Sequence, residues 1–250
     1  MSESVRKEKF IDKELPLLNS IFEDDRVGYI MFELQNHEKR AKRRNKKKAH
    51  FTNFITFLQS INKEVIKMNP SSNNSKLIKL HNNQINLLYH VALKFLGYDL
   101  PLWKKYIKFL IKNKNLTLLQ KVINRALLLH GSISDSLYMI AVEVEIKFLR
   151  NIQKAREIYT SGLQTHKYSS NLYFEAFKYE LVNSKILIQE VSDSGKELNS
   201  YDPKLDVSVA KVIFESAVQN VKEDTDLFFQ MYHEANKYHF SLDLSKEIKK

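Results

Sequence analysis

The sequence predicts an all-α protein built as an array of helical hairpins. Gly (5) and Pro (4) are scarce among its 250 residues, so turns should be few and tight, and no segment shows a convincing strand pattern. A pair formed by Leu and an aromatic residue recurs every 35 residues, at Leu102-Trp103, Leu137-Tyr138 and Leu172-Tyr173. A period in the mid-thirties is typical of hairpin repeats that bury their apolar faces only by stacking, and such arrays mostly serve as binding scaffolds.

Each repeat is predicted to contain two helices with different signatures. In the first helix, aromatic or apolar residues follow the Leu-aromatic pair at i+3 and i+6, which keeps them on one helical face. In the second helix a small residue stands beside a bulky one, as in Ser161-Gly162-Leu163, and should let the two helices approach closely. The residues predicted to form the repeat core are Trp103, Tyr106, Phe109, Ala126, Tyr138, Ala155, Tyr159, Gly162, Tyr173, Tyr179, Ala217 and Phe228.

The repeat pattern extends in both directions with insertions. Upstream, Phe51, Phe54 and Phe57 copy the first-helix spacing, and downstream Leu227-Phe228 opens another first helix. The intervals to the neighbouring repeats, 52 and 55 residues, exceed 35. We expect the surplus residues to form polar loops at Met68–Ser75 and near Ser192–Pro203, which are rich in turn-forming residues.

Two further helices are predicted ahead of the first repeat. One runs from about Val5 to Phe22 and should end or bend near Glu14, because Pro16 lacks an amide hydrogen. The other begins at Asp24, a plausible N-cap, and continues into a run of basic residues. We therefore expect a helical extension over residues 1–48 and a repeat array over residues 49–250. The last repeat should be incomplete, as in a fragment or in an array closed by a partner, because the sequence stops inside a second helix.

The net charge of +11 is concentrated in residues 39–48, called the basic segment here. It contains eight cationic residues and no acidic ones: Lys39, Arg40, Lys42, Arg43, Arg44, Lys46, Lys47 and Lys48. These residues could contact RNA phosphates, act as a nuclear localisation signal, or form a solvated helix end. We favour the first two interpretations, which are compatible, because clustered like charges repel one another unless an anionic partner is present.

The composition argues against several other functions. The absence of cysteine excludes disulfides, thiolate metal sites and cysteine nucleophiles, and favours a reducing compartment. No apolar run approaches the length of a membrane span, so we expect a soluble intracellular chain. Ser194-Gly195-Lys196 lacks the remaining residues of a phosphate-binding loop, and no histidine pair has metal-binding spacing on one helix. We therefore predict no catalytic residue, metal, cofactor or small-molecule substrate.

The second-helix motif resembles that of the half-a-tetratricopeptide (HAT) repeat. Ala155-Arg156-Glu157-Ile158-Tyr159 matches it well, and the stretch from Lys211 to Ala217 is a weaker copy. Tyr173 with Tyr179-Glu180 matches the first-helix motif, whereas Leu110 replaces the usual Glu in the repeat of Trp103. The resemblance implies a right-handed superhelical array and a role in RNA processing, because HAT repeats occur almost only in RNA-processing proteins.

The order of motifs in the N-terminal third resembles one HAT family in particular. The Leu-Pro-x-Leu segment at Leu15, the double arginine at Arg43-Arg44 and the aromatic helix at Phe51 are similar to the start of the U-three small nucleolar RNA-associated protein 6 family. The similarity covers essentially the whole chain in order. His50 and the segment 56–58 depart from the family, because the acidic residues usual around this helix are missing.

The family resemblance implies a non-enzymatic subunit of the UtpB subcomplex in the nucleolar small-subunit processome. Its expected partners are WD-repeat propeller proteins, with small nucleolar RNA and pre-ribosomal RNA bound directly or through the complex. A HAT scaffold of pre-mRNA splicing or 3′-end processing is the first alternative. The α-subunit of a protein prenyltransferase is a second one, although its repeat favours a Trp late in the hairpin.

Overall fold

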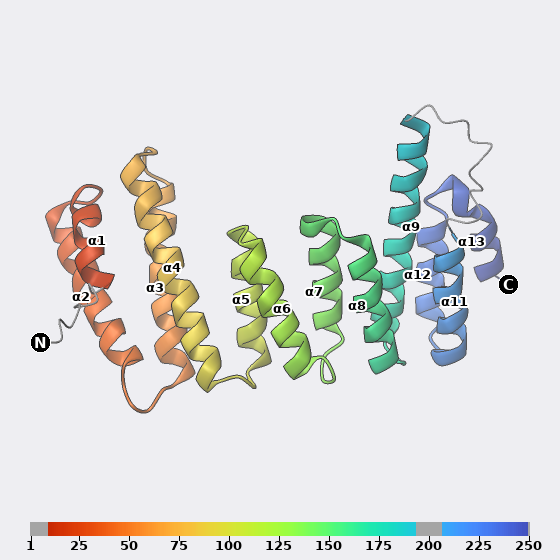
Figure 1. Cartoon of the computed structure of the whole chain (residues 1–250), viewed down its shortest axis with the longest axis horizontal. Helices are drawn as coiled ribbons and strands as arrows, with labels where there is room; N and C mark the ends of the chain where they lie inside the picture. Colours follow the sequence, from red (N-terminus) through yellow and green to blue (C-terminus); the bar gives the residue numbers. More distant parts are fainter. Residues whose placement is uncertain (1–9, 194–206, 250) are drawn as a thin grey trace, which may run out of the picture. The chain divides into compact units, whose positions relative to one another are not determined.

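The computed structural model describes residues 10–193 and 207–249, and these residues form 12 α-helices and no strand. Consecutive helices pack as neighbouring antiparallel pairs (Figure 1), which confirms the all-α class and a repeat-like arrangement of hairpins. The chain divides into two compact units, one up to Tyr106 and one from Ile107, and the division falls inside one helix.

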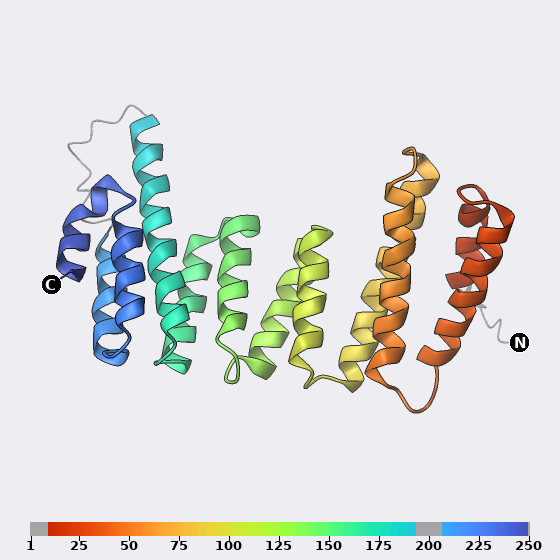
Figure 2. The same cartoon turned by 180° about the vertical axis from the view of Figure 1, so that it is seen from behind.

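The first unit contains four helices and the start of a fifth. Its core is built from fully buried aliphatic and aromatic residues, among them Leu18, Ile30, Phe51, Phe54 and Leu77. The helix α3 packs against α4 along most of its length (Figure 2), while α1 contacts both α2 and α4. The helices are α1 (Phe10–Asn19), α2 (Asp24–Ala41), α3 (Lys48–Ile66), α4 (Ser72–Phe95) and α5 (Leu100–Lys112).

The helix α1 continues past Pro16 to Asn19, so of the two predicted outcomes near Glu14, an end or a bend, the end is wrong. Pro16 points to solvent, while Glu14 and Leu18 on either side of it are fully buried. The packing of these two side chains outweighs the missing amide hydrogen, because a whole buried face holds the helix in place. The predicted cap is also corrected: Asp24 is the first helical residue and Glu23 is the N-cap. The predicted helical stretch before Phe10 lies outside the described residues.

Most of the surplus residues upstream lengthen the helices, and of the predicted loop at Met68–Ser75 only residues 68–71 lie outside a helix. The helices α3 and α4 have 19 and 24 residues, whereas α5 has 13. Only residues 67–71 connect α3 to α4, because the hydroxyl of Ser71 accepts a hydrogen bond from the Asn74 amide and starts α4 at Ser72. Downstream, α9 (Ser170–Asp193) also has 24 residues, and the rest of the predicted loop there lies outside the described residues.

The second unit continues the alternation of first and second helices. The predicted first helices correspond to α5, α7, α9 and α12, and the predicted second helices to α6, α8, α11 and α13. A π-helical turn, Glu145–Leu149, follows α7 and ends at Arg150 in the left-handed conformation with φ 52°. The bounds are α6 (Leu116–His130), α7 (Ser136–Val144), α8 (Ile152–Thr165), α11 (Ser208–Asn220), α12 (Thr225–Ala235) and α13 (Leu242–Ile248).

Ten of the twelve predicted core residues are buried, whereas Tyr179 and Phe228 are partly exposed. The rings of Tyr89 and Tyr106 stack at 4.7 Å, and the Trp103 Nε1–H donates to the Gly97 carbonyl over 2.7 Å. These contacts occupy the faces and edges of the rings. The buried aromatic residues are therefore packed against neighbouring helices, which leaves no room for RNA bases to stack on them.

Gly162 provides a test of the close approach between helices. A Cβ atom at this position would lie 2.9 Å from Cγ of Tyr138 and 3.0 Å from Cδ2 of Leu172. We expect Gly162→Ala to lower the free energy of unfolding by about 1–2 kcal/mol, because these buried groups would have to shift. Gly28→Ala is the matched control, because nothing lies within 4 Å of its added Cβ. It should stabilise α2 by up to about 1 kcal/mol in the same urea titration, and equal effects of the two changes would contradict the packing argument.

Candidate nucleic-acid interface

The basic segment spans a helix end, a loop and a helix start. Lys39 and Arg40 lie in the last turn of α2, residues 42–47 form the loop, and Lys48 is the first residue of α3. The first turn of α3 contains no acidic residue. The positive end of the α3 dipole therefore adds to the charge of the loop.

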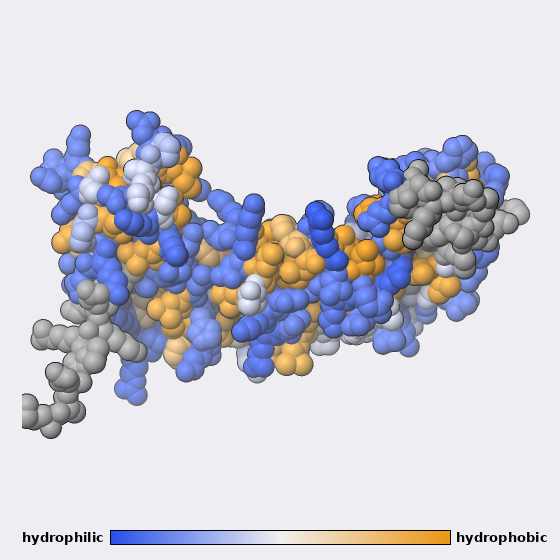
Figure 3. All heavy atoms as spheres, turned by 45° about the horizontal axis from the view of Figure 1, so that its top comes forward, coloured by the Kyte–Doolittle hydropathy of each residue, from blue (hydrophilic) through white to orange (hydrophobic). Residues whose placement is uncertain are grey.

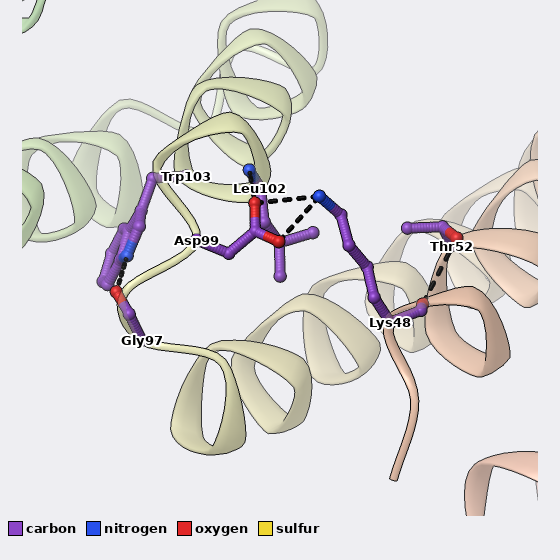
Figure 4. Close-up of polar contacts among 6 residues, drawn as sticks. All are labelled: Lys48, Thr52, Gly97, Asp99, Leu102 and Trp103. Carbon is purple, nitrogen blue, oxygen red and sulfur yellow. Dashed lines mark hydrogen bonds and ion pairs between the residues drawn. The ribbon is translucent and has the colours of Figure 1, made fainter.

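Lys48 anchors the end of the basic segment to the turn between α4 and α5 (Figure 4). Its Nζ lies 2.9 Å from Oδ1 and 2.6 Å from Oδ2 of Asp99. The same Asp99 carboxylate accepts a hydrogen bond from the Leu102 amide over 3.0 Å and so caps α5. One carboxylate thus joins the start of α3 to the start of α5 within the first unit.

Two further lysines of the basic segment have partners within the chain. The Nζ of Lys46 lies 3.3 Å from the carbonyl oxygens of Ala41 and Arg43, and 5.1 Å from the ring centroid of Phe95. Lys46 therefore satisfies carbonyl groups at the C-terminus of α2. Lys42 is paired with Glu38 one turn earlier in α2, over 2.7 Å.

The remaining five cations of the basic segment face solvent. All five side chains are exposed, and none forms an ion pair with a residue that the structure describes; they are Lys39, Arg40, Arg43, Arg44 and Lys47. The structure therefore divides a run of like charges into three lysines with intramolecular partners and five cations available to an external anion. The sequence alone did not reveal this division.

His37 precedes the basic segment but adds no charge to it at neutral pH. Its ring is buried and stacks on Phe54 at 5.4 Å and against Phe57 at 5.1 Å. Burial lowers the pKa of His37, and the nearby Arg40 lowers it further, while Glu33 acts in the opposite direction. The histidine belongs to the hydrophobic contact between α2 and α3.

The motif residues that suggested the HAT repeat contact one another in the second unit. Glu180 of α9 accepts hydrogen bonds from Arg156 Nε (2.9 Å) and Nη2 (2.6 Å) of α8, and from the Tyr159 hydroxyl (2.6 Å). Glu180 is only 2% exposed. Burial and the hydrogen bond to Glu180 strongly raise the pKa of Tyr159. This cluster links the second helix of one repeat to the first helix of the next.

A pocket of about 390 Å³ opens beside this cluster. The π-helical turn and α8 line one side of it, and the C-terminal half of α9 lines the other. Its lining includes Ile146, Ile152 and Ile186 together with Arg156 and Glu180. Hydrophobic side chains are exposed over the α7–α9 region in the space-filling view (Figure 3).

Within the described residues, no group of three histidine, aspartate or glutamate side chains could hold a metal ion. The same residues include no helix that is both long and apolar enough to cross a membrane. The predicted division between residues 48 and 49 falls at the start of α3, and α1 and α2 pack with α3 and α4 in one compact unit.

No protein-family model matches the chain, and a search of curated proteins finds no match.

Proposed function

We propose that the protein is a non-catalytic, right-handed superhelical HAT scaffold of an RNA-processing particle, with an N-terminal helical extension that contacts RNA. The observation that carries this proposal is the structure of the basic segment. Three of its lysines have partners within the chain, and five of its cations are exposed, two at the end of α2 and three in the loop that follows. Phosphate groups of RNA are the abundant polyanion that such a loop suits.

The particle that fits best is the small-subunit processome of the nucleolus. This assignment rests on the motif order that resembles the U-three small nucleolar RNA-associated protein 6 family. In such a particle the protein would join WD-repeat propeller subunits and support processing of small-subunit pre-ribosomal RNA. The Arg156–Tyr159–Glu180 cluster supports the HAT assignment, because residues of the quoted motifs contact one another across a repeat boundary.

The RNA contact is tested by reversing the exposed loop charges. We expect Arg43→Glu, Arg44→Glu and Lys47→Glu together to weaken RNA binding more than about 10-fold and to lower the slope of log K against log salt by about 2. None of the three side chains has a structural partner among the described residues, so the fold should be unaffected. Fluorescence anisotropy over a salt series provides the measurement.

A matched charge reversal elsewhere in the first unit is the control. Lys67, Lys76 and Lys79 are also exposed and lie at the other end of the α3–α4 hairpin. Replacing them with Glu changes the net charge by the same amount, so long-range repulsion is the same in both variants. Equal losses of affinity would show that only the total charge matters and would refute a specific RNA contact at the basic segment.

The particle itself is tested by affinity purification of the protein from cells. Small nucleolar RNA and propeller proteins among the bound molecules would support the small-subunit processome. Spliceosomal RNA or 3′-end processing factors would favour the first alternative instead. A prenyltransferase β-subunit in the preparation would favour the second alternative.

A further inference from the structure

Two exposed aromatic rings lie beside the basic segment in the first unit. Phe95, the last residue of α4, is 55% exposed, and Tyr98 in the following turn is 93% exposed. The Nζ of Lys46 is 5.1 Å from the centroid of the Phe95 ring. Lys48 is ion-paired with Asp99, the residue directly after Tyr98 (Figure 4). Two separate contacts therefore place this turn next to the basic segment.

Cations beside exposed rings form the combination that binds single-stranded nucleic acid. The cations neutralise phosphates, while each ring offers a face on which a base can stack. A duplex hides its base faces within the helix, so a stacking residue can contribute to binding only when the strand is single. A peptide of acidic residues would use the cations but has no aromatic base to stack on the rings.

We propose that the basic segment and the rings of Phe95 and Tyr98 form one binding surface for single-stranded RNA, on which Tyr98 stacks a base. This proposal rests on the RNA contact in the proposed function and goes beyond it by naming the strand state and the stacking residue. The cations of the loop bind the backbone, and the turn between α4 and α5 binds the base.

Exposure of Tyr98 alone does not carry the proposal, because the position is a general feature of the repeat. Tyr98, Ile133 and Tyr168 each precede the aromatic residue of a Leu-aromatic pair by five positions. Ile133 and Tyr168 are also exposed, at 73% and 79%. Only the turn of Tyr98 is joined to the basic segment by an ion pair and a cation–π contact. Tyr168 is therefore a matched control: an exposed tyrosine at the same repeat position without the basic loop.

The test uses a labelled single strand of about 12 nucleotides, a length suited to such surfaces. Its binding is compared with that of the same sequence as a duplex. We expect Tyr98→Ala to weaken binding of the single strand about 5- to 150-fold, the range for one lost base stack. Tyr98→Phe should bind like the unmodified protein, because the ring is kept. Tyr168→Ala should leave binding unchanged, and the affinity of Tyr98→Ala for the duplex should equal that of the unmodified protein.

The outcomes separate this proposal from the proposed function. If reversal of the three loop charges weakens binding but Tyr98→Ala does not, the stacking surface is refuted while the RNA contact stands. If the unmodified protein binds neither strand form, the RNA contact itself fails. Competition by an oligoglutamate as effective as competition by RNA would also overturn the proposal, because such a peptide can satisfy only the charges.

Discussion

Glu14→Ala is expected to lower the free energy of unfolding by about 2–5 kcal/mol, because it leaves a buried ring nitrogen of His81 without its partner and opens a cavity. Glu14 of α1 and His81 of α4 are both fully buried and in contact, Oε1 to Nε2, over 2.5 Å. The other ring nitrogen of His81 lies 2.6 Å from Oδ1 of Asn62 in α3. Because this amide oxygen can only accept a hydrogen bond, Nδ1 of His81 carries a hydrogen. Nε2 is the ring nitrogen in contact with Glu14. Urea denaturation of the two forms measures the difference.

Two substitutions control for simple loss of volume. Leu18→Ala removes a fully buried aliphatic side chain from the same helix and should cost about 2–5 kcal/mol without altering pH dependence. Glu14→Gln keeps the shape and a hydrogen-bonding amide, so it should cost less than Glu14→Ala. If Glu14→Gln and Glu14→Ala destabilise the protein equally, neither the retained volume nor the amide hydrogen bond offsets the loss of the carboxyl group, which contradicts the expected order.

The same pair predicts a pH dependence with a definite sign. Burial raises the pKa of Glu14 above its ordinary 4.5, and the hydrogen bond and charge of His81 lower it only in part. The folded protein therefore binds this proton more tightly than the unfolded chain. The stabilisation from protonated Glu14 is complete below pH 4.5 and is lost as the pH rises through the raised pKa of Glu14 in the folded protein. The advantage of the unmodified protein over Glu14→Gln should shrink over that range, and a constant difference would contradict the assignment.

Glu180→Ala is expected to destabilise the second unit by about 2–4 kcal/mol, because it leaves Arg156 and Tyr159 without their acceptor. The lower end of the range reflects Arg156, whose side chain is 35% exposed and can be hydrated in part. Thermal unfolding followed by circular dichroism provides the measurement. A loss of cooperativity between α8 and α9 should accompany the lower melting temperature, because the cluster joins these two helices.

Tyr159→Phe separates the hydroxyl from the ion pair. It removes one hydrogen bond to Glu180 but leaves both Arg156 bonds, so we expect a loss of about 1 kcal/mol. The double variant Tyr159→Phe with Glu180→Ala should be less destabilised than the sum of the single changes, because the hydroxyl no longer matters once its acceptor is gone. Strict additivity would show that the three side chains do not act as one cluster.

Local pattern was enough to predict the repeats themselves. The Leu-aromatic pairs at Leu137 and Leu172 lie in the first turns of α7 and α9, where the 35-residue stride places them. Gly162 lies where a larger residue would clash with Tyr138. These features depend on helical periodicity and residue size over a few turns, which are visible in the sequence.

Local pattern was misleading where packing competes with propensity. Pro16 and the turn-forming residues from Ser72 to Ser75 argue against helix, yet both lie inside helices. Leu18 and Leu77 are fully buried on the faces of those helices. The burial of such faces is worth more than the propensity of single residues, so the length of each helix is decided by its neighbours.

The sequence by itself determined the all-helical class, the repeat stride, most of the core and the location of the positive charge. Only the tertiary structure decided which polar residues meet, as in Lys48 with Asp99, Glu14 with His81 and Arg156 with Glu180. These partners lie 51, 67 and 24 positions apart. Whether a charge is buried, paired or free depends on which helices pack together, and no periodicity of a single helix encodes that choice.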